Sequence, residues 1–164
     1  MTRILGIDPG LVKTGWGVID HSGSSLKFVA CGLIKPTSTI PLAERLCTLS
    51  HGIKRIIEEY NPDDCAIEET FVNKNPISSL KLGHARGALM LTVSLAGINL
   101  AEYAATLVKK SITGVGRAEK NQIIMMVKQL MPTAKIDSED AADALAVAIC
   151  HSSHAKYKII EKIT

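Results

Sequence analysis

Four carboxylates stand at places in the sequence where a buried apolar residue would be expected. Asp8 ends the apolar run ILGI, and Glu68 ends the run CAI. Asp140 and Asp143 lie three residues apart within DAADALAVA, so a helix there carries both on one face. Burying an unpaired carboxylate costs several kcal/mol or forces it to stay protonated. A divalent cation would offset that cost, and carboxylate oxygens with no Cys or His among them favour Mg²⁺ or Mn²⁺ over Zn²⁺.

Each acid also has an ordinary structural explanation. Asp8 precedes a Pro-Gly pair and fits turn chemistry, and Glu68 and Glu69 fit the solvent-facing end of a strand. Asp140 fits the first turn of a helix, where acids suit the helix dipole. Asp143 lies deeper in the same helix between alanines and is harder to explain this way. It is unusual for two strand ends and one helix face all to carry acids for structural reasons alone. Periodicity by itself, however, does not show that the acids converge.

The elements that must position these acids follow from the hydrophobic pattern. Short apolar runs bounded by turn residues predict strands, and apolar residues at three- and four-residue steps predict amphipathic helices. The expected strands cover 3–8, 15–20, 26–35, 65–67 and 98–103, and the expected helices cover 42–60, 78–96, 104–111, 118–130 and 138–151. The first three strands should form an antiparallel meander. Strands that then alternate with helices predict a mixed sheet with helices packed on its faces.

Length and composition limit the classes of protein that this chain can belong to. With 164 residues, 46% of them hydrophobic and 21% charged, it predicts one packed domain and excludes wholesale disorder. The net charge of +3 indicates nothing by itself about partners. Asp8 interrupts any signal-peptide core, and no apolar stretch reaches the ~20 residues of a membrane span. The four cysteines contain no C-x-x-C pair, so we expect reduced thiols in a cytoplasmic protein without a membrane segment.

Five segments, in this order along the chain, resemble the RuvC family of Holliday junction resolvases, the crossover junction endodeoxyribonucleases: LGIDPG, AIEETFVNKN, SSLKLGHARG, EYAATLVKKSITGVGRAEK and DAADALAVAI. The resemblance covers positions 4 to about 149. It implies an α/β protein with a ribonuclease H-like fold, whose five-stranded mixed sheet (three antiparallel strands, then two parallel ones) carries helices on both faces. We expect this nuclease domain over residues 1–152 and a C-terminal tail over residues 153–164.

The resemblance also implies an activity. Family members act as homodimers on four-way junction DNA in recombination and repair, and resolve it by paired symmetric nicks. They use Mg²⁺, with Mn²⁺ as a substitute, and two ions per subunit suit hydrolysis that leaves a 5′-phosphate and a 3′-hydroxyl. The family further implies the RuvA–RuvB branch-migration complex as a partner.

Residue by residue, the catalytic and metal-binding acids of the family fall on Asp8, Glu68, Asp140 and Asp143. The aromatic that intrudes at the strand exchange point falls on Phe71, and the DNA-contacting lysines near the active site fall on Lys109 and Lys120. Because a cleft of acids repels a polyanion, further cations should surround it. Candidates for this nucleic-acid-binding rim are Lys74, Lys81, Arg86, Lys110 and Arg117, and the alternative for each is ordinary solvated surface.

Two other functions compete with the nuclease. The pattern D-x-G-x-x-x-T-G also resembles the first phosphate loop of actin-like and sugar kinase ATPases, but those proteins need two such lobes and this chain has length for one. A scaffold that binds junctions without cutting them is the second alternative, and a non-catalytic binder gains nothing from acids that face phosphates. The helix over 78–96 carries a stripe of small residues suited to close packing against a symmetry mate, or against its own sheet.

Overall fold

The computed structural model describes residues 1–70 and 75–161, with side chains described as far as His154. Its elements follow one another as β1 (Thr2–Asp8), β2 (Thr14–Ser22), β3 (Ser25–Ile34), α1 (Leu42–Tyr60), β4 (Asp64–Glu68), α2 (Pro76–Leu95), β5 (Asn99–Tyr103), α3 (Ala105–Thr113), α4 (Lys120–Leu130) and α5 (Glu139–Glu161).

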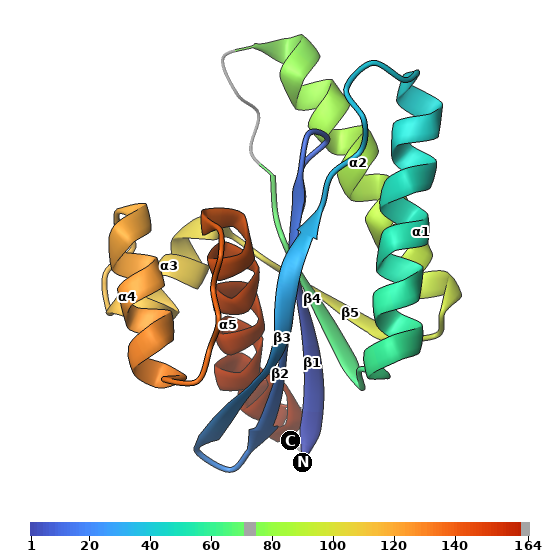
Figure 1. Ribbon diagram of the computed structural model, residues 1–164. Coiled ribbons are helices and arrows are strands. Elements are labelled where there is room, and N and C mark those ends of the chain that lie inside the picture. The colour runs from blue at the N-terminus through green and yellow to red at the C-terminus, as the bar shows by residue number, and fades with distance from the viewer. Residues whose placement is uncertain (71–74, 162–164) are drawn as a thin grey trace.

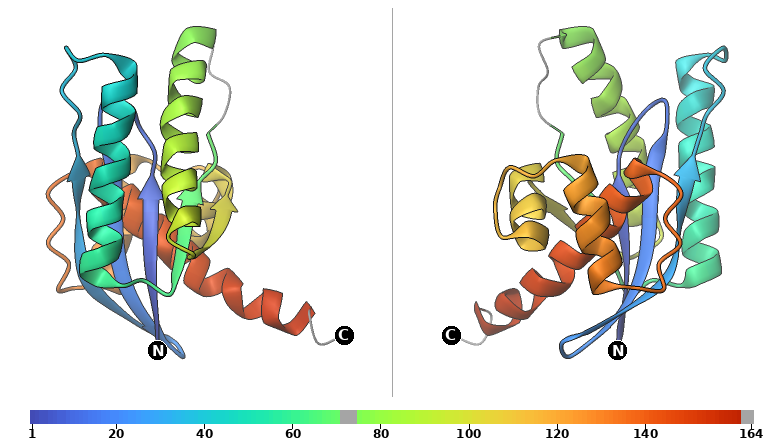
Figure 2. Two further views of the ribbon diagram at one scale, coloured as in Figure 1. Left: turned by 90° about the vertical axis from the view of Figure 1, so that its right-hand side faces the viewer. Right: turned by 60° about the vertical axis from the view of Figure 1, so that its left-hand side comes forward.

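The strands form a five-stranded sheet in the order β3-β2-β1-β4-β5. β1, β2 and β3 pair antiparallel, whereas β4 lies parallel to both β1 and β5. Helices α1 and α2 cover one face of this sheet, and α3, α4 and α5 cover the other (Figures 1 and 2). The predicted mixed sheet with helices on both faces is therefore confirmed.

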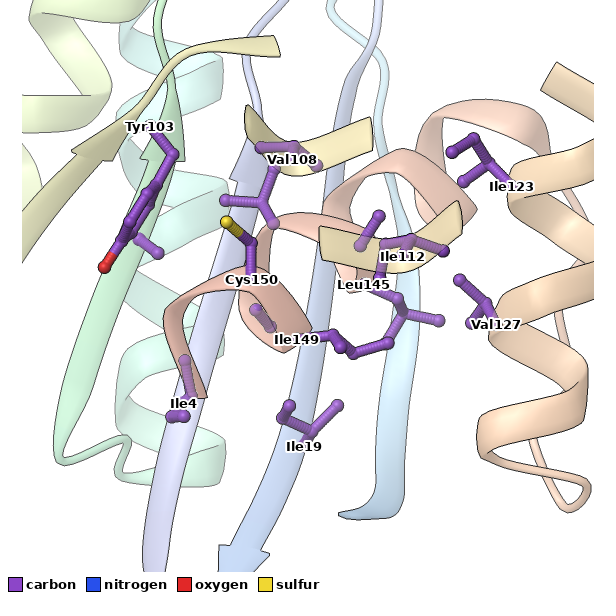
Figure 3. Packing of buried hydrophobic residues seen from close by; sticks show 14 of the residues in the cluster. Ile4, Ile19, Tyr103, Val108, Ile112, Ile123, Val127, Leu145, Ile149 and Cys150 are labelled. Carbon is purple, nitrogen blue, oxygen red and sulfur yellow. The ribbon is translucent and has the colours of Figure 1, made fainter. Parts of the chain in front are cut away.

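Successive side chains of the central strands point to opposite faces of the sheet and enter two separate cores. Leu5 and Ile7 of β1 pack toward α1 and α2, whereas Ile4 packs toward α5. In β4, Ile67 packs toward α1 and α2, and Ala66 packs toward α5. Figure 3 shows the second core, in which side chains of α3, α4 and α5 meet the sheet.

Local capping sets where the helices begin. The Asn75 side chain accepts hydrogen bonds from the N–H groups of Ile77 and Ser78 at 3.0 and 3.2 Å, which starts α2. The Ser138 hydroxyl accepts from the Ala141 N–H at 3.2 Å and starts α5 in the same way. Asp140 is therefore a first-turn residue of a helix that Ser138 caps.

The end of α5 differs from the expectation. The sequence predicted that this helix ends at residue 151, and this is wrong, because α5 continues to Glu161. The segment 152–161 contains neither Gly nor Pro, so no residue in it stops a helix. The division into a nuclease domain up to residue 152 and a separate tail stays a prediction.

Candidate active site

Asp8 and Glu68 lie side by side because β1 and β4 are parallel neighbours in register. Ile7 of β1 pairs with Ile67 of β4, so the next residue of each strand stands at the same edge of the sheet. The alternation of side chains places Asp8 on the α5 face with Ile4, and Glu68 on that face with Ala66. Two acids separated by sixty positions in the chain thus share one face and one edge.

α5 brings the other two acids to this edge because glycines let it approach the sheet closely. A Cβ atom on Gly15, the partner of Asp8 in the β1–β2 ladder, would stand 2.0 Å from the Asp140 carbonyl oxygen. A Cβ on Gly6 would stand 2.1 Å from the Ala144 carbonyl oxygen. The first turns of α5 therefore rest directly on the backbone of β1 and β2, at the strand ends that carry the acids (Figure 2).

Burial, with a smaller contribution from mutual repulsion, sets the electrostatics of Asp8, Glu68 and Asp143. Burial raises the pKa of Asp8 to about 8, and the charges of Glu68, Asp143 and Asp140 add to that rise. Burial also raises the pKa of Glu68 to about 7, with a further rise from Asp143. The pKa of Asp143 is raised by burial as well. The charges of these acids therefore act on one another, which periodicity alone did not show.

Lys109 of α3 and Lys120 of α4 face this cluster. Together with Glu68 and Asp143 they line a cavity of about 120 Å³. Lys109 lowers the pKa of Glu68 and of Asp143, and Lys120 lowers that of Asp8 and of Asp143, each in opposition to burial. Lys120 also forms an ion pair with Glu139 at 2.9 Å. Both lysines that the resemblance assigned to DNA contact therefore border the acids.

Lys13 is a neighbour of the acids that the sequence reasoning did not single out. Its ammonium group forms an ion pair with the Asp140 carboxylate. Within residues 1–70 and 75–154, no three Asp, Glu, His or Cys side chains lie, as they stand, in positions that could hold a metal ion. Lys13 thus neutralises one of the four acids, Asp140.

The remaining predicted residues lie in different surroundings. Phe71 and Lys74 lie outside the described residues. Lys81 is exposed on α2. Arg86, also on α2, donates to the Glu68 carbonyl at 3.3 Å and forms an ion pair with Glu102 of β5. Its role in DNA binding stays a prediction, but the structure gives Arg86 a second role in holding the end of β4.

Comparison with known proteins identifies the family. A family model described as "Crossover junction endodeoxyribonuclease RuvC" matches residues 4–151. The chain belongs to the RuvC family. The RuvC crossover junction endodeoxyribonuclease of Azorhizobium caulinodans is 55% identical over 154 residues, which cover 94% of this chain and 91% of that protein.

Solved structures extend the similarity to the RuvC fold. T. thermophilus RuvC, solved in complex with a Holliday junction substrate, matches this chain with a TM-score of 0.89 and 26% identity over 96% of this chain and 97% of that one. A yeast mitochondrial Holliday junction resolvase shares the fold, with a TM-score of 0.69 at 13% identity over 99% of this chain and 85% of that one. Membership of the RuvC family decides between the two functions that the D-x-G-x-x-x-T-G pattern left open, in favour of the endodeoxyribonuclease over the ATPase lobe.

The helices of this RuvC family member were expected to include no membrane segment. In residues 1–70 and 75–161, no helix combines the length and the apolar character that crossing a membrane requires.

Proposed function

We propose that this chain resolves Holliday junctions by metal-assisted hydrolysis at the site formed by Asp8, Glu68, Asp140 and Asp143. Family membership supports the activity. The observation that supports the site is the convergence of these acids, from two strand ends and one helix, beside Lys109 and Lys120. Burial and mutual repulsion raise the pKa values of Asp8, Glu68 and Asp143, which destabilises the fold, and perturbed carboxylates of this kind are typical of catalytic sites.

The donor set fits hard divalent cations. All four candidate ligands are carboxylates, which suit Mg²⁺ or Mn²⁺, and a cation would offset the burial and the mutual repulsion that raise the pKa of Asp8. We propose that Asp8, Glu68, Asp140 and Asp143 hold two Mg²⁺ ions, with Mn²⁺ as a substitute. Bound there, the ions would lower the pKa of an attacking water and stabilise the leaving 3′ oxygen, so that the products would carry a 5′-phosphate and a 3′-hydroxyl.

The protein's own cations would bring the DNA to these acids. Lys109 and Lys120 border the cavity and can contact phosphates on either side of the scissile bond. Phe71 at the strand exchange point and Lys74, Lys81 and Arg86 on the rim complete the proposed DNA interface.

The assembly is also part of the proposal. A four-way junction has two-fold symmetry and needs two cuts, so a homodimer with one site per subunit matches it. The exposed side chains of Leu80 and Leu91 on α2, together with the open space around Gly83 and Gly87, support a subunit contact there. A cytoplasmic location, and the RuvA–RuvB complex as the partner that delivers junctions, follow from the family resemblance.

Junction cleavage by acid variants tests this proposal. A labelled mobile four-way junction is incubated with the protein, with Mg²⁺ or with EDTA, and the products are separated on a denaturing gel. We expect paired symmetric nicks with Mg²⁺ only. Asp8→Asn and Glu68→Gln should lower cleavage by at least ~10³-fold and still bind the junction, because each removes a ligand without adding charge.

Glu69→Gln is the matched control. Glu69 adjoins Glu68 in sequence but is exposed beyond the end of β4. Its variant should therefore cut at the unsubstituted rate. If Asp8→Asn also cuts at that rate, the assignment of the site is wrong. If the unsubstituted protein binds the junction with Mg²⁺ and never nicks it, the chain is a scaffold instead.

A further inference from the structure

Lys13 contacts the proposed metal site from a loop that is itself firmly held. The loop joins β1, which ends at Asp8, to β2, which begins at Thr14. The Thr14 hydroxyl donates to the Gly10 carbonyl at 2.7 Å and accepts from the Gly10 N–H at 3.2 Å, which closes the loop on itself. Arg45 of α1 donates to the Leu11 carbonyl at 2.8 Å and ties the loop to the helix. The backbone at Lys13 is therefore fixed, and only its side chain is left to move.

The Lys13 side chain reaches from this loop to Asp140. Its ammonium group pairs with the carboxylate oxygen Oδ2, while the lysine side chain stays 46% exposed and that of Asp140 only 16%. The carboxylate is thus the enclosed partner and the ammonium group stands at the mouth of the site. Lys120 of α4 pairs instead with Glu139, which is not among the proposed metal ligands.

We propose that Lys13 is an exchangeable counter-ion of the metal site. It neutralises Asp140 while the site holds no cation, gives up this carboxylate when a divalent cation binds, and then contacts a DNA phosphate. The inference rests on the proposed function, because it takes Asp140 as a metal ligand. Lys13 is a positioning and DNA-contacting residue in this scheme, since it touches no reacting atom.

Charge explains the exchange. A cation and an ammonium group cannot both occupy Asp140 Oδ2, and a divalent ion would interact with several of the acids, whereas Lys13 pairs with one. Once released, the ammonium group remains at the exposed mouth, where phosphate is the counter-ion that DNA supplies. Metal loading and DNA affinity should therefore be coupled through this side chain.

Metal binding without DNA gives the first readout. Titration calorimetry with Mn²⁺ compares the unsubstituted protein with Lys13→Met and with Lys120→Met, each of which removes one positive charge near the acids. Lys13→Met should bind Mn²⁺ about three- to ten-fold more tightly, because the metal no longer displaces an ion pair. Lys120→Met should show a smaller gain, since its partner Glu139 is not a proposed ligand. Equal gains in the two variants, or no gain in Lys13→Met, would overturn the exchange.

The salt dependence of junction binding gives the second readout. Anisotropy of a labelled four-way junction is measured across a salt series, once with EDTA and once with Ca²⁺, a hard cation that takes carboxylate ligands. With Ca²⁺, Lys13→Met should lower the slope of log K against log salt by about one, the loss of one phosphate contact. With EDTA the slope should equal that of the unsubstituted protein, since Asp140 then holds Lys13. A slope lowered equally in both conditions, or in neither, contradicts the inference.

The two proposals fail in different ways. If the unsubstituted protein binds no Mn²⁺, the metal site and the exchange are both wrong. If the unsubstituted protein binds Mn²⁺ and Asp143→Asn weakens that binding, the metal site stands. An unchanged affinity in Lys13→Met then refutes the exchange alone.

Discussion

Replacing Gly15 by Ala tests whether the close approach of α5 to the sheet assembles the acid cluster. The added Cβ would stand 2.0 Å from the Asp140 carbonyl oxygen and 2.5 Å from the carbonyl carbon. An ordinary C···O contact is about 3.3 Å, so the start of α5 must move by roughly 1.3 Å. The two nearest atoms belong to the backbone of Asp140, and the third is its Cβ at 3.1 Å, so no flexible end of a side chain can give way. The backbone of Gly15 is in a region open to any residue, since its φ is not among the positive values.

The expected cost is about 2–3 kcal/mol of unfolding free energy, typical of overpacking against a rigid neighbour. For a chain of this size, that corresponds to a fall of about 5–10 °C in Tm. Urea denaturation measures the free energy, and Mn²⁺ titration at a temperature where the variant stays folded measures the site. Displacement of Asp140 should weaken metal binding at least ~10-fold in the folded variant, because a ligand out of position loses its coordination.

Gly116→Ala is the matched control. Its Cβ would also meet a backbone carbonyl oxygen, that of Thr106, but at 3.6 Å, which is an ordinary contact. The variant should match the unsubstituted protein or gain up to ~1 kcal/mol through its less flexible unfolded chain. If Gly15→Ala is within about 0.5 kcal/mol of the unsubstituted protein and binds Mn²⁺ equally well, the glycine contact does not position α5 and the reasoning is refuted.

Two further predictions concern charge. Without divalent metal, the unfolding free energy should fall as pH rises from about 5 to about 8, because Asp8 and Glu68, with pKa values raised to about 8 and 7, keep protons in the folded state that the unfolded chain has already released. The folded state then binds more protons than the unfolded state, so the slope of unfolding free energy against pH is negative. Urea denaturation in EDTA at pH 5.5 and 8 measures this change. A rise in stability over that range would show that the acids are not buried together. Lys109→Met and Lys120→Met should each weaken junction binding and lower its salt slope by about one, whereas Lys54→Met, on α1 and paired with Glu58, should leave the slope unchanged. Equal salt slopes in all three variants would show that Lys109 and Lys120 are ordinary surface residues that do not contact DNA phosphates.

Much of the fold follows from local patterns in the sequence. Successive side chains of the apolar runs that end at Asp8 and Glu68 point to opposite faces of the sheet. This alternation is a property of any strand, and both faces are apolar because helices cover both. The helix over Leu42–Tyr60 follows from apolar residues at three- and four-residue steps. The helix end expected at His151 was wrong, because residues 152–161 carry no stop signal. The motifs that resemble the RuvC family were equally visible in the sequence, since they are contiguous.

Contacts between segments far apart in the chain decided the rest. The pairing of Ile7 with Ile67 brings Asp8 beside Glu68, and no local pattern encodes which strand lies next to which. Nothing in the sequence distinguishes Gly15 from the other glycines. Only the packing of α5 shows that the absence of a side chain at Gly15 lets Asp140 approach the sheet. The same holds for Lys13, because only the fold places this loop residue beside the Asp140 carboxylate. The sequence determined which chemical groups the chain carries and on which face of each element they lie, because those properties are local. The tertiary structure alone decided that the acids meet, because their meeting depends on parallel pairing across a long crossover and on a helix that touches bare backbone.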